Sequence, residues 1–91
     1  MVEHAPGIRL DKWLWHARFF KTRGLAAETV AGGVRLNGAR VTKPSTTVRP
    51  GDELAFKQAK TVRAVRVLAI GERRGPAAEA QTLYEDMVSP P

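Results

Sequence analysis

Cationic side chains in the first half of the chain are the residues whose types and spacing could carry chemistry. Residues 8–43 hold eight Lys or Arg against two acidic residues, so they alone match the +6 net charge of the whole 91-residue chain. Guanidinium and ammonium groups on a rigid surface neutralise phosphates. The pattern therefore indicates binding of a polyanion. The candidate phosphate contacts are Arg9, Lys12, Arg18, Lys21, Arg23, Arg35, Arg40 and Lys43.

Each of several polar or aromatic residues between these cations has two possible roles. Thr22 and Ser45 can donate hydrogen bonds to phosphate, and the same side chains can cap a helix and form a turn. Asn37, which precedes a glycine, is either a ligand contact or only a turn former. Asp11 is either a helix cap or a carboxylate that orients nearby arginines. Trp15 either stacks on a base or ribose or packs under a C-terminal helix.

Catalytic and metal chemistry have few residues available. The chain contains no cysteine, which removes disulfides, thiolate zinc sites and thiol catalysis, and fits a reducing compartment. His4 and His16 are too few and too isolated for a metal site. Ser45 and Ser89 stand in no nucleophile motif. We expect no enzymatic activity, no cofactor and no metal.

Composition and length indicate a single cytoplasmic domain. The chain is 43% hydrophobic and 26% charged, which is ordinary for one folded unit of 91 residues. Met1–Gly7 lacks a basic region followed by an apolar one, and no run approaches the ~18 apolar residues of a membrane span. We therefore expect a cytosolic protein without membrane contact.

Two short helices are predicted to position the first cations. One begins near Leu10, with Asp11 as its N-cap, because apolar residues recur at helical spacing. Its buried stripe comprises Leu10, Trp13, Leu14 and Ala17, and its opposite face carries Lys12, Trp15 and His16. The second runs from Thr22 or Arg23 to Ala31, is capped by Thr22, and buries Leu25, Ala26, Thr29 and Val30.

Alternating residues then predict a small sheet. Strands at 34–36 and 39–41 flank Asn37-Gly38, a dipeptide that tolerates the positive φ of a tight hairpin. A turn at 48–52 precedes a strand at 53–56, a polar link at 57–60 and a long strand at 61–70. Arg63 and Arg66 cannot share a face of a regular strand, so we expect either a bulge or a strand twisted at a sheet edge near Ala64-Val65.

The C-terminal region is predicted to be helical. Pro76 suits the first position of a helix, and Ala77, Ala80, Tyr84 and Met87 would share one of its sides. The predicted segments are a flexible N-terminus at 1–7, a binding domain at 8–70, and a C-terminal helix and tail at 71–91.

Four motifs in fixed order resemble the RNA-binding domain named after ribosomal small-subunit protein S4. They are an R-L-D-x-x-L helix start at 9–14, a T-R pair at 22–23, the G-V-R-L-N-G hairpin at 33–38 and V-R-P-G-D at 48–52. Further matches at 10–15, 18–23 and 73–85 resemble the ribosome-associated heat shock protein 15 subfamily. The resemblance implies an α+β fold with two N-terminal helices on a small, mostly antiparallel sheet and a C-terminal helix. Members of that subfamily often continue with a long basic C-terminal extension, whereas this sequence stops at Pro91.

The resemblance also implies a partner. We expect binding to ribosomal RNA of the large subunit, with transfer RNA as a further candidate, in rescue of stalled subunits that carry a nascent chain after heat shock. We expect a monomer. Two alternatives remain open: an RNA-targeting domain of a larger enzyme such as a pseudouridine synthase, and a holdase-type chaperone.

Overall fold

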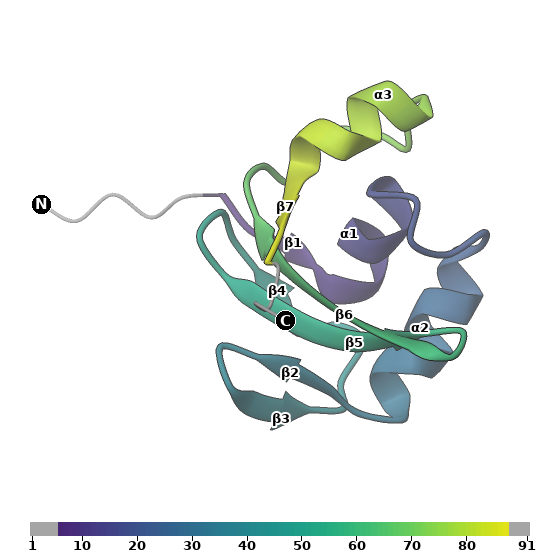
Figure 1. Cartoon of the computed structure of the whole chain (residues 1–91), viewed down its shortest axis with the longest axis vertical. Coiled ribbons are helices and arrows are strands. Elements are labelled where there is room, and N and C mark those ends of the chain that lie inside the picture. The colour runs from purple at the N-terminus through teal and green to yellow at the C-terminus, as the bar shows by residue number, and fades with distance from the viewer. Residues whose placement is uncertain (1–5, 88–91) are drawn as a thin grey trace, which may run out of the picture.

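The computed structural model describes residues 6–87 and shows two helices on one side of a twisted sheet (Figure 1). Helix α1 spans Leu10–His16 and helix α2 spans Arg23–Ala31. The expected flexible segment at 1–7 lies largely outside the described residues, as do tail residues 88–91. This is the α+β arrangement that the sequence predicts.

The two helix starts differ in how they are capped. Thr22 caps α2 as predicted, because its hydroxyl oxygen accepts a hydrogen bond from the Leu25 amide at 3.1 Å. The prediction that Asp11 caps α1 is wrong. The cap position is Arg9, whose side chain makes no capping bond, and Asp11 lies inside the first turn.

Helix α1 ends in a Schellman motif. The Phe19 amide donates to the Leu14 carbonyl at 3.1 Å, and the Arg18 amide donates to the Trp15 carbonyl at 3.1 Å. The residue between the two helices that turns the chain is Arg18, with φ of 63°. Glycine normally fills this left-handed position, so the surroundings must hold the arginine there.

In the part of the chain that the structure describes, five strands form the main sheet in the order β3-β2-β5-β6-β7, and two short strands pair separately. The main-sheet strands are β2 (Val34–Leu36), β3 (Ala39–Val41), β5 (Glu53–Gln58), β6 (Thr61–Val67) and β7 (Tyr84–Asp86). The separate pair joins β1 (Ile8–Arg9) to β4 (Thr47–Val48). Every pairing is antiparallel.

The β2–β3 hairpin confirms the turn prediction at Asn37-Gly38. Both residues have positive φ, 51° and 85°, as the tight two-residue turn requires. The β5–β6 hairpin corrects two expectations. Half of the predicted link at 57–60 is strand, because β5 continues to Gln58 and only residues 59 and 60 form the turn. The register from Glu53↔Arg66 to Gln58↔Thr61 is unbroken, so the predicted bulge is absent from it.

The C-terminal segment is helical for less of its length than predicted. Helix α3 spans Ala77–Ala80, a short 3₁₀ helix η1 spans Gln81–Leu83, and the chain then becomes strand β7. Tyr84 therefore does not share a helix face with Ala80. The free edge of β6 offers backbone hydrogen bonds that a continued helix would leave unused, and β7 takes them.

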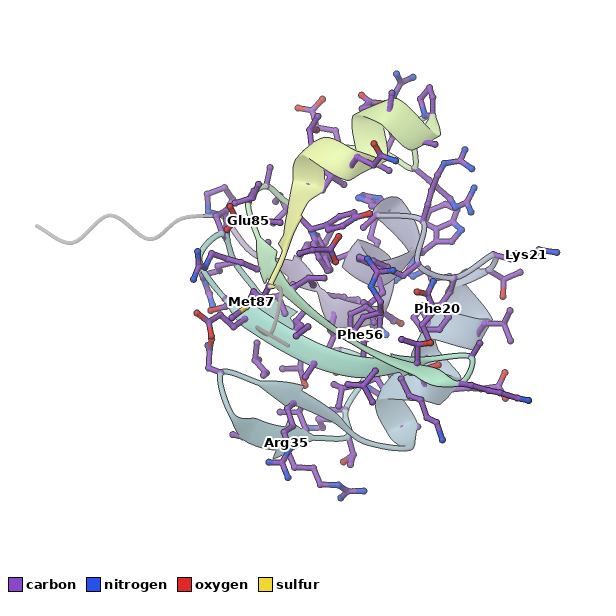
Figure 2. The ribbon with its side chains drawn as sticks, viewed as in Figure 1. Phe20, Lys21, Arg35, Phe56, Glu85 and Met87 are labelled. Carbon is purple, nitrogen blue, oxygen red and sulfur yellow. The ribbon has the colours of Figure 1, made fainter. Side chains whose placement is uncertain are left out.

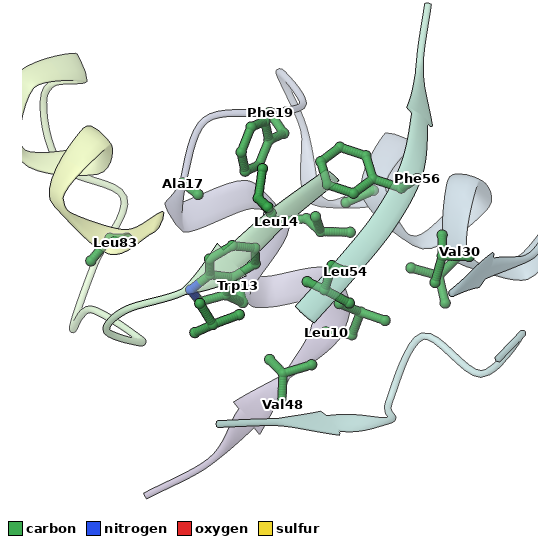
Figure 3. Close-up of a cluster of buried hydrophobic side chains, with 14 residues drawn as sticks. Leu10, Trp13, Leu14, Ala17, Phe19, Val30, Val48, Leu54, Phe56 and Leu83 are labelled. Atoms are coloured by element: carbon green, nitrogen blue, oxygen red, sulfur yellow. The ribbon is translucent and has the colours of Figure 1, made fainter. Parts of the chain in front are cut away.

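The core lies between the helices and the sheet (Figure 3). It combines the predicted stripe of α1 with side chains of the loop that follows, of α2, of η1 and of four strands. Its buried residues are Leu10, Trp13, Leu14, Ala17, Phe19, Ala26, Val30, Val34, Val48, Leu54, Phe56, Val65, Val67 and Leu83. Within residues 6–87, the helices are all too short to cross a lipid bilayer.

Two side chains lie on faces other than those predicted. His16 is buried, because the segment around Gly71 and Leu83 covers that side of α1, and its Nδ1 lies 3.2 Å from the Ile70 carbonyl oxygen. Leu25, expected to be buried, is 46% exposed. Helix α2 packs against the core through Ala26 and Val30 instead.

Candidate nucleic-acid interface

The start of α1 and the loop after β3 form one end of the candidate interface. The Leu10 amide donates to the Thr46 carbonyl at 2.8 Å, and the Asp11 amide donates to the Pro44 carbonyl at 3.2 Å. These bonds fix the 43–46 loop beside the first turn of α1. The exposed side chains of Lys43 and Ser45 are therefore held next to that turn.

Asp11 organises two of the predicted arginines. Its carboxylate accepts hydrogen bonds from Arg9 Nε and Nη2 at 3.1 and 3.0 Å, and lies 3.8 Å from Arg23 Nη2. Burial raises the pKa of Asp11, but the hydrogen bonds and charge of Arg9, with the charge of Arg23, outweigh burial and hold that pKa below its ordinary value. The ionised carboxylate thus orients an arginine from each side, which is the second of its two readings.

The loop before α2 presents the next cation. Lys21 is exposed, and Figure 2 shows its side chain extending away from the protein at the end of the loop. Thr22 follows as the cap of α2, so the free amides of the first turn lie close to this lysine. Lys12 lies half-buried on α1, one residue after Asp11.

These residues define what we call the helical face: Arg9, Lys12, Lys21, Thr22, Arg23, Lys43 and Ser45. Contacts through Asp11 connect Arg9 to Arg23, and backbone bonds place the loop of Lys43 and Ser45 beside them. Lys12, Lys21 and Thr22 adjoin these residues along the chain. Within residues 6–87, Lys12, Lys21 and Lys43 make no ion pair. The structure thus brings together seven of the eleven residues that the sequence analysis selected.

The remaining four candidates lie elsewhere. Arg35 and Arg40 are direct partners across β2 and β3, and strand alternation turns them to the side opposite the buried Val34. Asn37 is exposed, and its side-chain oxygen accepts a hydrogen bond from the Glu53 amide at 2.8 Å. Arg18 donates through Nε to the carbonyl of Gly75.

Three of the seven cations in the second half are paired with carboxylates in the described part of the chain. Arg63 binds Asp86 at 2.7 Å, and Arg73 binds Glu79 at 3.2 Å. Arg66 lies between two glutamates, at 3.2 Å from Glu53 and 3.1 Å from Glu85. Pairing reduces the outward field of these arginines, so the positive potential is concentrated on the first half of the chain.

Arg74 is a residue that the sequence analysis did not select. Its guanidinium lies 5.8 Å from the centre of the Trp15 ring. Trp15 is half-buried beside this arginine of the loop before α3, and its stacking on a base or ribose stays a prediction. The only sign of Arg74 in the sequence was the adjacent pair Arg73-Arg74. In the described part of the chain, His, Asp and Glu form no cluster of three suited to a metal ion.

The fold and the family comparison agree on the class of protein. The S4 domain family model matches residues 8–54, which contain helices α1 and α2, the β2–β3 hairpin and the whole helical face. The chain therefore belongs to the S4 domain family.

More particularly, the chain resembles heat shock protein 15. It is 52% identical over 83 residues to heat shock protein 15 of Escherichia coli K12, covering 90% of this chain and 62% of that protein. The trimeric structure of Vibrio cholerae heat shock protein 15 superposes with a TM-score of 0.82 at 42% identity, covering 90% of this chain and 83% of that one.

A further relative is the RQC P-site tRNA stabilizing factor of Halalkalibacterium halodurans. It is 38% identical over 79 residues, covering 86% of this chain and 88% of that protein. The chain spans less than two thirds of the length of the Escherichia coli protein. Our expectation of a monomer stays a prediction, since the Vibrio cholerae relative was solved as a trimer.

Proposed function

We propose that this chain binds ribosomal RNA of the large subunit through the helical face, in the rescue of stalled subunits that carry a nascent chain on transfer RNA. The observation that carries the proposal is the pair of arginines oriented by Asp11. A carboxylate that holds two cations in place reduces the side-chain entropy that each loses on binding phosphate. The proposed role is binding, and it involves no catalytic step.

The shape of the helical face suits structured RNA. Backbone hydrogen bonds fix the 43–46 loop to the start of α1, and the ion pair between Arg23 and Asp11 connects the start of α2 to the same turn. A rigid array of this kind selects the phosphate spacing of a folded RNA, because the deep major groove of A-form RNA admits few side chains. Sequence-specific contacts to base edges play a smaller part in this proposal.

The names of the relatives support the choice of partner. One is a tRNA stabilizing factor of the P-site, and others are heat shock proteins of the same family. The P-site tRNA of a stalled subunit would lie beside the bound chain in this proposal. Ribosomal RNA supplies the docking surface, and the transfer RNA marks the subunit that requires rescue.

Co-sedimentation with purified ribosomal subunits tests this function. The chain should pellet with large subunits and not with small ones, and large subunits carrying peptidyl-tRNA should retain more of it than vacant ones. Equal retention on both kinds of subunit would refute specific docking on the large one. Equal retention on vacant and peptidyl-tRNA-bearing large subunits would remove the rescue role and leave RNA binding.

A further inference from the structure

The loop between α1 and α2, residues 17–22, carries Lys21 and the cap of α2, and its conformation needs support. Its second residue, Arg18, lies in the left-handed region at φ of 63°, which an L-residue adopts only when its surroundings hold it. No regular strand or helix includes the loop. What holds this segment therefore determines where Lys21 lies.

Two side chains from the second half of the chain bind the backbone of this loop. Gln58, at the end of β5, donates through Nε2 to the Phe19 carbonyl at 2.7 Å. Arg74 donates through Nη2 to the next carbonyl, that of Phe20, at 3.5 Å. The two carbonyls immediately before Lys21 are thus both bound from outside the loop.

Gln58 is itself fixed by a chain of contacts from β7. Arg63 donates to Gln58 Oε1 at 2.9 Å and to Asp86 Oδ1 at 2.7 Å. The same guanidinium lies 5.1 Å from the centre of the Phe19 ring. Strand β7 therefore supports the loop through Arg63 and Gln58, so its pairing with β6 has a consequence far from the sheet edge.

Arg74 is placed by packing more than by charge. It lies against the Trp15 ring, its Nε is buried, and that atom has no hydrogen-bond partner within residues 6–87. Burying an unpaired donor is unfavourable, so the contacts to Trp15 and to the Phe20 carbonyl must offset it. The adjacent Arg73 differs, because it is 70% exposed and faces Glu79.

We propose that Gln58 and Arg74 are positioning residues, which hold the 17–22 loop so that Lys21 meets phosphate. Arg18, which belongs to the loop itself, also connects the loop to the second half of the chain, because its Nε donates to the Gly75 carbonyl. The residues that bind the loop from outside it, Gln58, Arg74 and Gly75, all follow residue 54, where the match to the S4 domain family ends. The inference rests on the proposed function, and it gives residues 55–86 a role in RNA binding without contact to RNA.

Hydrogen exchange of the free protein, followed by NMR, tests the positioning directly. Arg74→Ala should speed exchange of the Phe19 and Leu25 amides by about tenfold, since local opening would become easier. Arg73→Ala removes the same charge from the neighbouring position and should leave both amides unchanged. Equal exchange in the two variants, or no change in either, would overturn the proposal whatever happens with RNA.

Affinity for the RNA of the large subunit separates positioning from direct contact. Arg74→Ala and Lys21→Ala should each weaken binding by about tenfold, and the double variant should bind little worse than either one, because both remove the same contact. Additive losses would mean that Arg74 binds phosphate itself, which contradicts the inference.

Gln58→Ala tests the loss of a loop contact without any loss of charge. It should weaken binding several-fold at a temperature where circular dichroism shows the variant fully folded, while Gln81→Ala, an exposed glutamine of η1, should not. Unaltered binding by folded Gln58→Ala would overturn its assignment. If the wild-type chain does not bind the RNA, the proposed function fails, while the exchange experiment still decides whether these residues hold the loop.

Discussion

Replacing Lys21 and Arg23 together by alanine should nearly abolish binding to the large subunit while the fold remains intact. Both side chains are exposed at the start of α2. A hydrogen bond to a charged group contributes about 1.5 to 3 kcal/mol, and solvent exposure favours the lower value. Two lost contacts therefore amount to about 3 kcal/mol, which weakens binding by about 100-fold.

The cost of this double substitution to folding should be small. Arg23 lies 3.8 Å from Asp11 and its side chain is 44% exposed, so this ion pair contributes less than about 1 kcal/mol. Asp11 keeps its closer hydrogen bonds to Arg9. A thermal melt within a few degrees of the wild type would confirm that the loss of binding is not a loss of structure.

A matched control removes the same charge from outside the helical face. Arg49 and Lys60 are exposed and make no ion pair within residues 6–87, so Arg49→Ala with Lys60→Ala lowers the net charge equally. Fluorescence anisotropy with labelled large-subunit RNA, measured at several salt concentrations, should show a slope reduced by roughly 1.5 to 2 units only for the first pair. Equal losses of affinity in the two double variants would show that total charge governs binding, and would refute the site.

Three other substitutions test the fold that supports this face. The pKa of Asp11 is lowered in the folded state, so its contribution of about 1 kcal/mol should be present above its unfolded pKa of about 3.9 and lost as pH falls through the lower folded value. The difference in unfolding free energy between wild type and Asp11→Asn, from urea titrations at pH 3 to 6, should therefore narrow toward the acid end. A constant gap would contradict this. Asn37→Ala should lower the free energy of unfolding by about 1 to 2 kcal/mol, because it removes the bond to the Glu53 amide in a turn of positive φ. Loss of RNA affinity at unchanged stability would instead make Asn37 a contact. Trp13→Phe should cost about 2 to 3 kcal/mol, since it leaves a small cavity and frees the Ala69 carbonyl that the indole N–H binds at 2.9 Å. Calorimetry that shows an unchanged melting temperature would be inconsistent with that packing.

Features set by a few neighbouring residues were predictable from the sequence. The cap of α2 and the β2–β3 turn depend on Thr22 and on Asn37-Gly38, whose side chains and φ preferences act within a single turn of chain. The buried stripe of α1 follows from its helical spacing and was also predicted correctly. Local chemistry decides these elements, so no distant partner had to be known.

Features that depend on distant partners were missed. The segment from Tyr84 becomes a strand because β6 leaves an edge open, and no pattern within the segment shows that edge. Arg63 and Arg66 were read as signs of a bulge, whereas each finds a carboxylate of β7 on its own face of a regular strand. Missing β7 thus led directly to the second error.

The same division holds for the candidate site. Charge density selected the helical face, because cations near two helix starts can be counted along the chain. The separation of Arg35 and Arg40 from that face follows from the side on which the sheet meets the helices, which strand alternation alone leaves open. The role of Arg74 required knowing that Trp15 lies beneath it.

The pairing of β1 with β4 has a consequence for modularity. Ile8 and Val48 are direct partners. The two ends of a 41-residue stretch that contains α1, α2 and the β2–β3 hairpin therefore lie next to each other. Because the pairing fixes the residues just before α1, a sequence attached ahead of residue 8 can be exchanged without rearranging the helical face. The sequence after residue 48 cannot be exchanged in the same way, since Gln58 and Arg74 bind the loop that carries Lys21. The domain is therefore open to fusion at one end and committed to its own continuation at the other.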